Sequence, residues 1–133
     1  MKEIRINDIQ ISNDKPFVLI AGLNVLEEEK VILEVISKCK QDAEKFKIPY
    51  IFKASYDKAN RSSYSSYRGP GVKKGLAILS ELKKDFNVPV ISDIHTPEEA
   101  ELAAEVLDII QIPAFLSRQT DLIEAACRTS RPL

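Results

Sequence analysis

The sequence predicts an α/β fold whose strands lie parallel in one sheet, and three observations support this prediction. Short apolar runs of strand length alternate four times with segments of helical periodicity. The strand-like runs are continuously apolar, which is typical of strands covered on both faces. The 133 residues are the ordinary size of one domain. We therefore expect a single domain over residues 1–133, in which right-handed crossovers connect the parallel strands.

The first part of the chain predicts a hairpin, a strand and a helix. Isoleucine alternates with polar residues on either side of Asn7 and Asp8, which predicts a β-hairpin over residues 3–11. After a breaker that ends at Pro16, the run FVLIAG predicts a strand covered on both faces. Over residues 27–46, apolar side chains recur every three or four positions and glutamates fill the first turn, as expected for an amphipathic helix.

The remaining part predicts three further strands, each followed by a helix. The strands are expected at 48–52, 88–91 and 108–113, and the helices at 72–86, from 97 onward and at 119–128, with a long polar loop at 53–71. Thr96, Pro97 and Glu99 form a strong helix start, in which Thr96 caps and Glu99 closes a capping box. This order fits a doubly wound sheet or half of a (β/α)8 barrel, which usually needs about 250 residues. The chain looks cut where a fifth strand would begin.

Composition and charge exclude several classes of protein. The net charge is −1, so no overall attraction to nucleic acid is expected. No run of about 18 apolar residues predicts a membrane span, and the amino-terminal segment lacks the apolar core of a signal peptide. Cys39 and Cys127 lie beside apolar residues and lack zinc-type spacing. We interpret both as reduced thiols in the core of a cytoplasmic protein.

Polar side chains follow each of the four predicted parallel strands. In both candidate architectures, functional groups gather at the carboxyl ends of the strands, so we expect these side chains to converge on one mouth. In chain order, the candidates are Asn24, Lys53, Ser55, Lys58, Asn60, Arg61, Ser62, Asp93, His95, Gln111, Pro113 and Arg118.

The cations Lys53, Lys58 and Arg61 fall within nine positions of one another. If they lay about 6 Å apart, each pair would repel by roughly 3 kcal/mol at an intermediate dielectric. A bound dianion would reverse that repulsion through charge-assisted hydrogen bonds. The spacing therefore favours a phosphorylated ligand, although a solvated basic loop balanced by Asp57 also fits.

Four further polar residues each have two interpretations. Gln111 interrupts an apolar strand, so it faces either a ligand or a polar layer inside a barrel, because a buried amide needs a partner. Asp93 either orients a sugar hydroxyl or makes a local hydrogen bond. His95 is structural or adjacent to a substrate rather than a metal ligand. Asn24 either contacts a ligand or serves a turn.

Five segments of the sequence resemble one known family. They are AGLNVLE, FKASYDKANRSS, YRGPG, SDIHTPEEA and DIIQIPAFLSRQTDL, and the resemblance extends from about residue 5 to residue 130. The family is 3-deoxy-D-manno-octulosonate 8-phosphate synthase (KDO 8-phosphate synthase), and KANRSS together with QIPAFLSRQTDL is its most specific pattern here. The related 3-deoxy-heptulosonate 7-phosphate synthases share the general plan but not this string.

The resemblance implies a fold, a reaction and an assembly. The fold would be a (β/α)8 TIM barrel with an N-terminal hairpin, of which this chain would be the N-terminal half. The reaction would condense phosphoenolpyruvate with D-arabinose 5-phosphate to give 3-deoxy-D-manno-octulosonate 8-phosphate and phosphate, for lipopolysaccharide biosynthesis. The assembly would be a cytoplasmic homotetramer that acts on small phosphorylated substrates, without nucleic-acid or membrane partners.

The resemblance also implies roles for individual residues. The catalytic positions would be Lys53, Asn24 and Asp93. Phosphoenolpyruvate would contact Lys53, Ser55, Lys58, Gln111, Pro113 and Ala114. Arabinose 5-phosphate would contact Asn60, Arg61, Ser62 and Asp93, and Arg118 would reach the sugar phosphate of a neighbouring subunit. One branch of the family binds a metal through a cysteine at the position of Asn24, so we expect a metal-independent enzyme without a cofactor.

Three alternatives stay open at this point. Lys53 at a strand end would also suit a Schiff-base aldolase. A 3-deoxy-heptulosonate 7-phosphate synthase-like enzyme shares the general plan. The chain could also be a non-catalytic half-barrel, because the later strands of the family carry further site residues, and we expect the 133 residues alone to be inactive.

Overall fold

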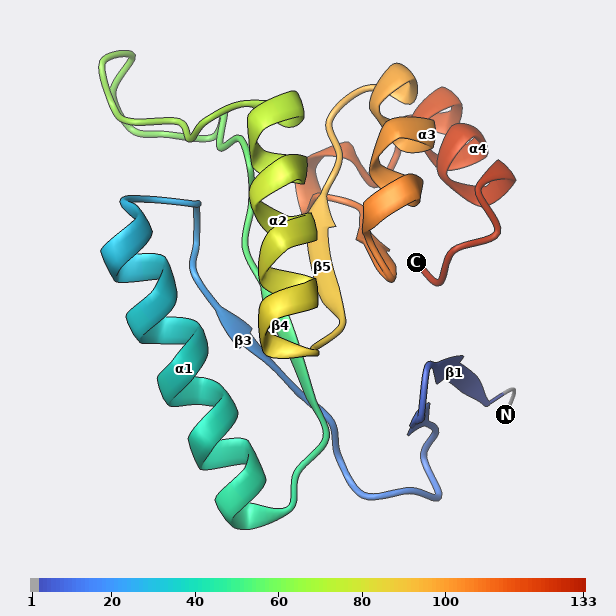
Figure 1. The fold of residues 1–133 in the computed structure, drawn as a ribbon. Coiled ribbons are helices and arrows are strands. Elements are labelled where there is room, and N and C mark those ends of the chain that lie inside the picture. Colours follow the sequence, from blue (N-terminus) through green and yellow to red (C-terminus); the bar gives the residue numbers. More distant parts are fainter. Residues whose placement is uncertain (1–2) are drawn as a thin grey trace.

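A computed structural model of the chain describes residues 3–133 (Figure 1). It begins with an antiparallel hairpin of β1 (Ile4–Ile6) and β2 (Ile9–Ile11). The following elements are β3 (Leu19–Gly22), α1 (Glu29–Phe46), β4 (Tyr50–Lys53), α2 (Val72–Phe86), β5 (Val90–Asp93), α3 (Pro97–Val106), β6 (Ile109–Gln111), the 3-10 helix η1 (Ala114–Leu116) and α4 (Thr120–Arg128). The predicted hairpin and βα units are all present in the predicted order. Within residues 3–133, no helix combines the length and the apolar character that crossing a membrane requires.

The strand order distinguishes the two architectures that the sequence left open. The four parallel strands pair in the order β3-β4-β5-β6, which is also their order in the chain. Right-handed crossovers between strands in sequential order place every helix on the same face, whereas a doubly wound sheet has helices on both faces. The Ile110 N–H donates to the Pro132 carbonyl at 3.0 Å, so the end of the chain lies along β6. The arrangement is that of half a (β/α)8 barrel.

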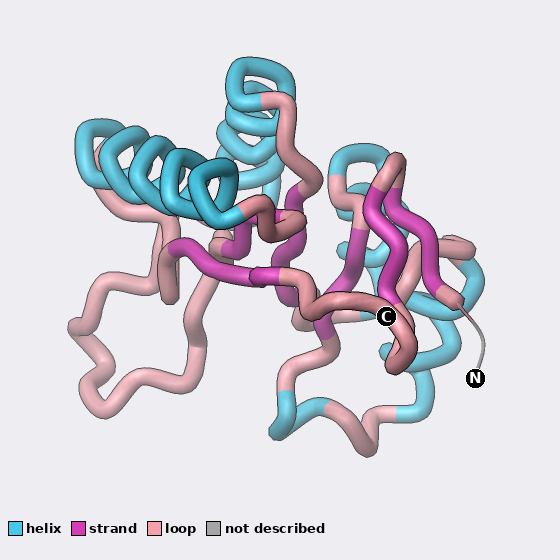
Figure 2. Tube along the Cα trace, turned by 90° about the horizontal axis from the view of Figure 1, so that it is seen from below, coloured by secondary structure: helices cyan, strands magenta, loops and turns pink. Residues whose placement is uncertain are grey.

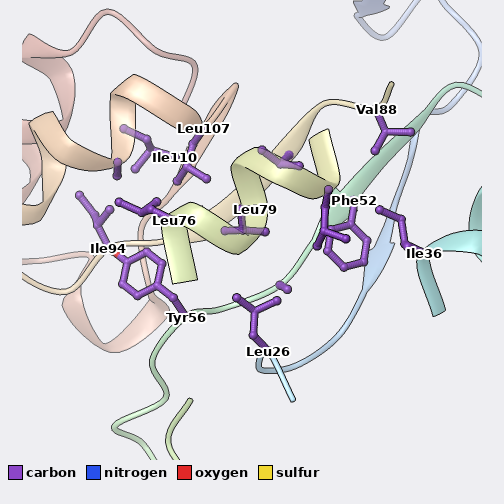
Figure 3. Close-up of a cluster of buried hydrophobic side chains, with 14 of the residues drawn as sticks. Leu26, Ile36, Phe52, Tyr56, Leu76, Leu79, Val88, Ile94, Leu107 and Ile110 are labelled. Atoms are coloured by element: carbon purple, nitrogen blue, oxygen red, sulfur yellow. The ribbon is translucent and has the colours of Figure 1, made fainter. Parts of the chain in front are cut away.

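The main core lies between the sheet and the helices (Figure 3). Alternate residues of β4, Tyr50 and Phe52, point toward this side and pack with Ile36 of α1 and with Leu76 and Leu79 of α2. Complete burial of each such side chain contributes about 1.5–3 kcal/mol. The period-two pattern of the strand thereby assigns its remaining residues to the opposite face.

The ends of α1 and α2 return the chain to the sheet in the same way. Each helix ends at a residue in the left-handed conformation, Lys47 with φ 55° and Asn87 with φ 48°. Their N–H groups donate to carbonyls of the last helical turn, which satisfies groups that the helix end leaves unpaired. Pro49 and Pro89 follow two residues later and prevent the helix from continuing, so β4 and β5 start side by side.

The opposite face of the sheet is apolar at one end and polar at the other. Ile51, Ile91 and Ile109 are buried there under Ile6 and Ile9 of the hairpin. The hairpin thus covers the amino ends of the strands, at the lower end of Figure 1, and Figure 2 views the molecule from that end. The polar residues that follow the isoleucines along each strand lie at the opposite edge, near the loop 53–71.

Three predictions about local structure were wrong. The strand β3 is not covered on both faces: Ile20 is 48% exposed, because β3 is the edge of the sheet and only its helix-facing residues pack. Cys127 is exposed rather than in the core, because α4 buries Leu122 and Ala126 instead, whereas Cys39 is partly buried and packs against the core as predicted. The capping box does not form, because the Thr96 side chain makes no capping hydrogen bond.

Candidate active site

The site is built around the carboxylate of Asp93 at the carboxyl end of β5. Lys53 Nζ donates to Asp93 Oδ1 at 3.2 Å, and the Ser55 hydroxyl donates to the same oxygen. Lys58 Nζ donates to Oδ2 at 3.2 Å, and His95 Nε2 lies 3.2 Å from that oxygen. Four groups, from the last residue of β4 and the segments that follow β4 and β5, therefore converge on one carboxylate.

The strand periodicity explains why these groups meet. Lys53 and Ser55 share the parity of Ile51 and so lie on the face opposite the helices. Asp93 and Gln111 pair in register and belong to the same face. The Asp93 side chain is only 2% exposed, whereas those of Lys53 and Lys58 are 18% and 14% exposed. The carboxylate is thus enclosed, and the lysines reach toward the surface.

The charges of the site shift the pKa values of its members. Burial by itself raises the pKa of Asp93, but hydrogen bonds from His95 and Ser55 and the charges of Lys53 and Lys58 outweigh it, so the pKa lies well below its usual range. Burial lowers the pKa of Lys53, and the nearby Lys58 adds to this, although the Asp93 charge opposes it. Asp93 is therefore ionised at neutral pH, and Lys53 is easier to deprotonate than an ordinary lysine.

A second carboxylate, Glu99 on the first turn of α3, lies behind His95. Glu99 Oε2 accepts hydrogen bonds from the His95 backbone N–H at 2.8 Å and from the Tyr56 hydroxyl at 2.7 Å, and it lies 3.5 Å from His95 Nδ1. Hydrogen bonding to Asp93 and then to Glu99 raises the pKa of His95 to about 9, against the effect of burial. Neither Glu99 nor Tyr56 was among the site residues predicted from the sequence.

A pocket of about 440 Å³ opens beside the Asp93 cluster. Its polar lining includes Lys58, Asn60, Asp93, His95 and Gln111, and Pro113, Ala114 and Phe115 supply an apolar wall. The volume is within the range of small-molecule sites in proteins, which begins at about 300 Å³. The structure therefore confirms the predicted convergence for residues that follow β4, β5 and β6, but not for Asn24, which follows β3.

Several predicted site residues lie outside this pocket. Lys53 and Ser55 contact Asp93, which lines the pocket, but do not line it themselves. Arg61 is exposed and lines a separate hollow with Arg68, Arg118 lies in another shallow hollow beside η1 and α4, and Ser62 and Asn24 are exposed. Asp57 pairs with none of Lys53, Lys58 and Arg61, the cations that the alternative interpretation expected it to balance. It forms a two-pronged ion pair with Arg68, at 2.9 and 2.6 Å.

The arrangement suits the binding of a small anion. Lys58 and Asp93 line the pocket, and Lys53 pairs with the same carboxylate without lining the pocket itself. An incoming phosphate or carboxylate could replace Asp93 as the partner of Lys58. Within residues 3–133, no group of three or more histidine, cysteine, aspartate or glutamate side chains is placed to hold a metal ion.

Comparison with known proteins identifies relatives along nearly the whole chain. Residues 2–133 match the model of the DAHP synthetase I family. Proteins named 2-dehydro-3-deoxyphosphooctonate aldolase are similar to this chain: one from Pseudomonas putida (strain GB-1) is 58% identical over 96% of the chain, and one from Hahella chejuensis (strain KCTC 2396) is 55% identical over 99%. The chain covers 46% and 47% of these two proteins, so it spans about half the length of the curated relatives it matches. These relatives confirm the resemblance to KDO 8-phosphate synthase, for which their name is a synonym.

Proposed function

The chain belongs to the DAHP synthetase I family, and from that premise we propose that the whole protein condenses phosphoenolpyruvate with D-arabinose 5-phosphate. The products are 3-deoxy-D-manno-octulosonate 8-phosphate and phosphate, and the product serves lipopolysaccharide biosynthesis. The observation that carries the proposal is the pair of lysines held on Asp93 at the edge of a pocket for a small molecule.

Phosphoenolpyruvate takes the place of Asp93 as the partner of the lysines. Lys58 binds it, together with Ser55 and Gln111, and Pro113 and Ala114 line its site. Gln111 lies level with Asp93 on the neighbouring strand and lines the pocket, which supports this placement. Each charge-assisted hydrogen bond to the ligand contributes about 1.5–3 kcal/mol.

The chemical step joins two anionic substrates that repel each other in solution. Carbon 3 of the enol phosphate attacks the sugar aldehyde, water adds at carbon 2, and phosphate leaves as the carbon–oxygen bond breaks. Lys53 stabilises negative charge on the aldehyde oxygen or supplies its proton, and its lowered pKa, caused first by burial, makes that proton easier to give up. Asp93 orients the hydroxyls of the sugar.

Arabinose 5-phosphate binds farther out, at Asn60, Arg61 and Ser62. Arg118 completes the phosphate site of a neighbouring subunit in a homotetramer, for which its exposure leaves it available. Asn24 contributes at the catalytic position, and no step of the reaction uses a metal, because an amide is a poor replacement for the thiolate of the metal-dependent branch. The enzyme works in the cytoplasm, where its thiols stay reduced.

The test measures phosphate release from phosphoenolpyruvate by the whole protein, with and without arabinose 5-phosphate. We expect release only with both substrates, and loss of most activity in Lys58→Ala but not in the control Lys38→Ala, whose side chain lies exposed on α1. The 133-residue chain alone should bind phosphoenolpyruvate without turnover. Phosphate release that does not require arabinose 5-phosphate would overturn the proposal. So would an equal loss of activity in Lys58→Ala and Lys38→Ala.

One observation favours a second candidate, a Schiff-base aldolase. The lowered pKa of Lys53, caused first by burial and then by Lys58, increases the fraction of neutral amine available as a nucleophile. Borohydride reduction in the presence of a carbonyl substrate distinguishes the two candidates. A covalent adduct on Lys53 supports the aldolase, whereas no adduct together with phosphate release supports the condensation.

A further inference from the structure

Glu99, in the first turn of α3, contacts both the backbone and the ring of His95. One oxygen, Oε2, accepts from the His95 backbone N–H at 2.8 Å and lies 3.5 Å from the ring nitrogen Nδ1. The same oxygen accepts from the Tyr56 hydroxyl at 2.7 Å, so α3 is tied to the segment after β4. The Glu99 side chain is 19% exposed. A single carboxylate therefore fixes the backbone of His95 and lies beside its ring, whose buried Nδ1 has no hydrogen-bond partner within residues 3–133.

The ring of His95 is confined on three sides. Asp93 Oδ2 lies 3.2 Å from Nε2, Glu99 faces Nδ1, and the Tyr56 ring meets the imidazole edge-on at a centroid distance of 5.8 Å. Both ring nitrogens can donate hydrogen bonds only when the imidazole is protonated. The other charged groups of the cluster face Asp93 from the end of β4 (Lys53) and from the segment that follows it (Lys58).

The donors of Asp93 differ in their freedom to move. Lys53 and Lys58 reach Asp93 on flexible four-carbon stems, and Lys58 lines the pocket. The backbone of His95 is instead held by Glu99, which Tyr56 also contacts. When an anion draws the lysines away, Asp93 remains enclosed with only Ser55 and His95 as donors. An enclosed carboxylate that loses its partners is costly, so the cost of ligand binding depends on His95.

From this geometry we propose that Glu99 is a positioning residue, which holds His95 so that Nε2 keeps donating to Asp93 while Lys53 and Lys58 turn to an anionic ligand. The identity of that ligand, phosphoenolpyruvate, rests on the proposed function. The positioning itself does not, because it concerns contacts within the chain.

The first experiment uses the fact that His95 is the only histidine in the sequence. In the tag-free 133-residue chain labelled at histidine, one imidazole signal followed by NMR against pH reports the pKa of His95 directly. In Glu99→Gln, the amide oxygen still accepts hydrogen bonds but the charge is gone. We expect the proton affinity of His95 to fall at least about tenfold, a pKa decrease of one or more. Glu98→Gln, on the same helical turn but exposed, should leave it unchanged.

The second experiment separates positioning from simple structural support and uses the whole protein. If Glu99→Gln lowers the His95 pKa by about 1.5, phosphoenolpyruvate binding at pH 8.5 should weaken about eightfold relative to the unsubstituted protein, because the protonated fraction falls. At pH 6.5 the imidazole is protonated in both proteins, and the two affinities should agree. Comparison at each pH cancels the ionisation of the ligand.

The outcomes distinguish the two proposals. Equal His95 titration in Glu99→Gln and in the unsubstituted chain overturns the positioning role, and so does an affinity loss of the same size at both pH values. Absence of phosphoenolpyruvate binding by the unsubstituted whole protein overturns the proposed function but leaves the titration result as a test of Glu99. If the 133-residue chain gives no dispersed spectrum, the two-pH comparison in the whole protein decides.

Discussion

The substitution Asp93→Asn tests how much the fold depends on the central carboxylate of the site. It keeps the shape of the side chain but leaves Lys53 and Lys58 without their shared counter-ion. Loss of one partner of a fully buried ion pair costs about 3–5 kcal/mol. Because the lysines are partly exposed and can turn to water, we expect a decrease of about 2–4 kcal/mol in the free energy of unfolding, a large share of the roughly 5–15 kcal/mol of an ordinary domain.

The pH dependence of this loss identifies its cause. The depressed pKa of Asp93 stabilises the fold above the unfolded value of 3.8, and this contribution is lost as the pH falls toward the folded pKa. The raised pKa of His95 acts in the opposite sense. Its contribution to stability is complete below pH 6.5, the unfolded pKa, and is lost as the pH rises through the folded pKa of about 9. The difference of about 2.5 between the two His95 values corresponds to about 3 kcal/mol as an upper bound, shared by Asp93 and Glu99.

Urea unfolding of the 133-residue chain, followed by circular dichroism from pH 4 to 9.5, measures the effect. The difference between the original chain and Asp93→Asn should be largest from about pH 4.5 to 6.5 and should shrink toward pH 9. Asp42→Asn, which removes the exposed pair with Lys38, should cost at most about 0.5 kcal/mol. A pH-independent loss, or a loss no larger than that of the control, would show that the cluster does not carry the stability assigned to it.

Three further predictions concern packing and ligand contacts. Gly75→Ala should destabilise the chain by about 1–3 kcal/mol in urea unfolding despite the better helix propensity of alanine, because its Cβ would collide with Tyr56; a stabilised variant would contradict this packing. Ile109→Ala should lower the free energy of unfolding by about 2–5 kcal/mol and loosen the hairpin, seen as faster hydrogen exchange at Ile6. An unchanged exchange rate at Ile6 would show that the hairpin does not depend on packing against Ile109. Arg61→Ala in the whole protein should raise KM for arabinose 5-phosphate at least about tenfold while changing stability by less than about 0.5 kcal/mol, because the side chain is exposed; an unchanged KM would remove it from the sugar-phosphate site.

The convergence of Lys53, Asp93 and Gln111 could be predicted from the sequence for a simple reason. Each stands at or near the end of a short apolar run, and parallel strands bring such ends to one edge of the sheet. The alternation of the strands then decides which side chains share a face. No knowledge of the loops is needed for this step, so regular structure alone is sufficient.

The part of the site that the sequence did not reveal depends on tertiary packing. Glu99 has the position of a capping-box residue. Its carboxylate instead accepts hydrogen bonds from Tyr56, 43 positions earlier, and from the backbone N–H of His95. The position of Arg61 depends on an irregular loop in which Asp57 pairs with Arg68, 11 positions later. Helix-start patterns and loop composition do not encode such distances. The spacing of His95 and Glu99 by four residues was the one available signal.

The distribution of burial around Asp93 determines which groups move when a ligand binds. The Asp93 side chain is 2% exposed, and both of its carboxylate oxygens accept hydrogen bonds. Moving it would separate an ionised group from these donors in a place that water hardly reaches, which is costly. The side chains of Lys53 and Lys58 are 18% and 14% exposed and stand on flexible stems, so they can turn to water more easily than Asp93. Exchange of counter-ions is therefore cheaper than movement of the strand end. Under the proposed function, Asp93 therefore stays in place when the anion binds, and Lys53 and Lys58 are the groups that move.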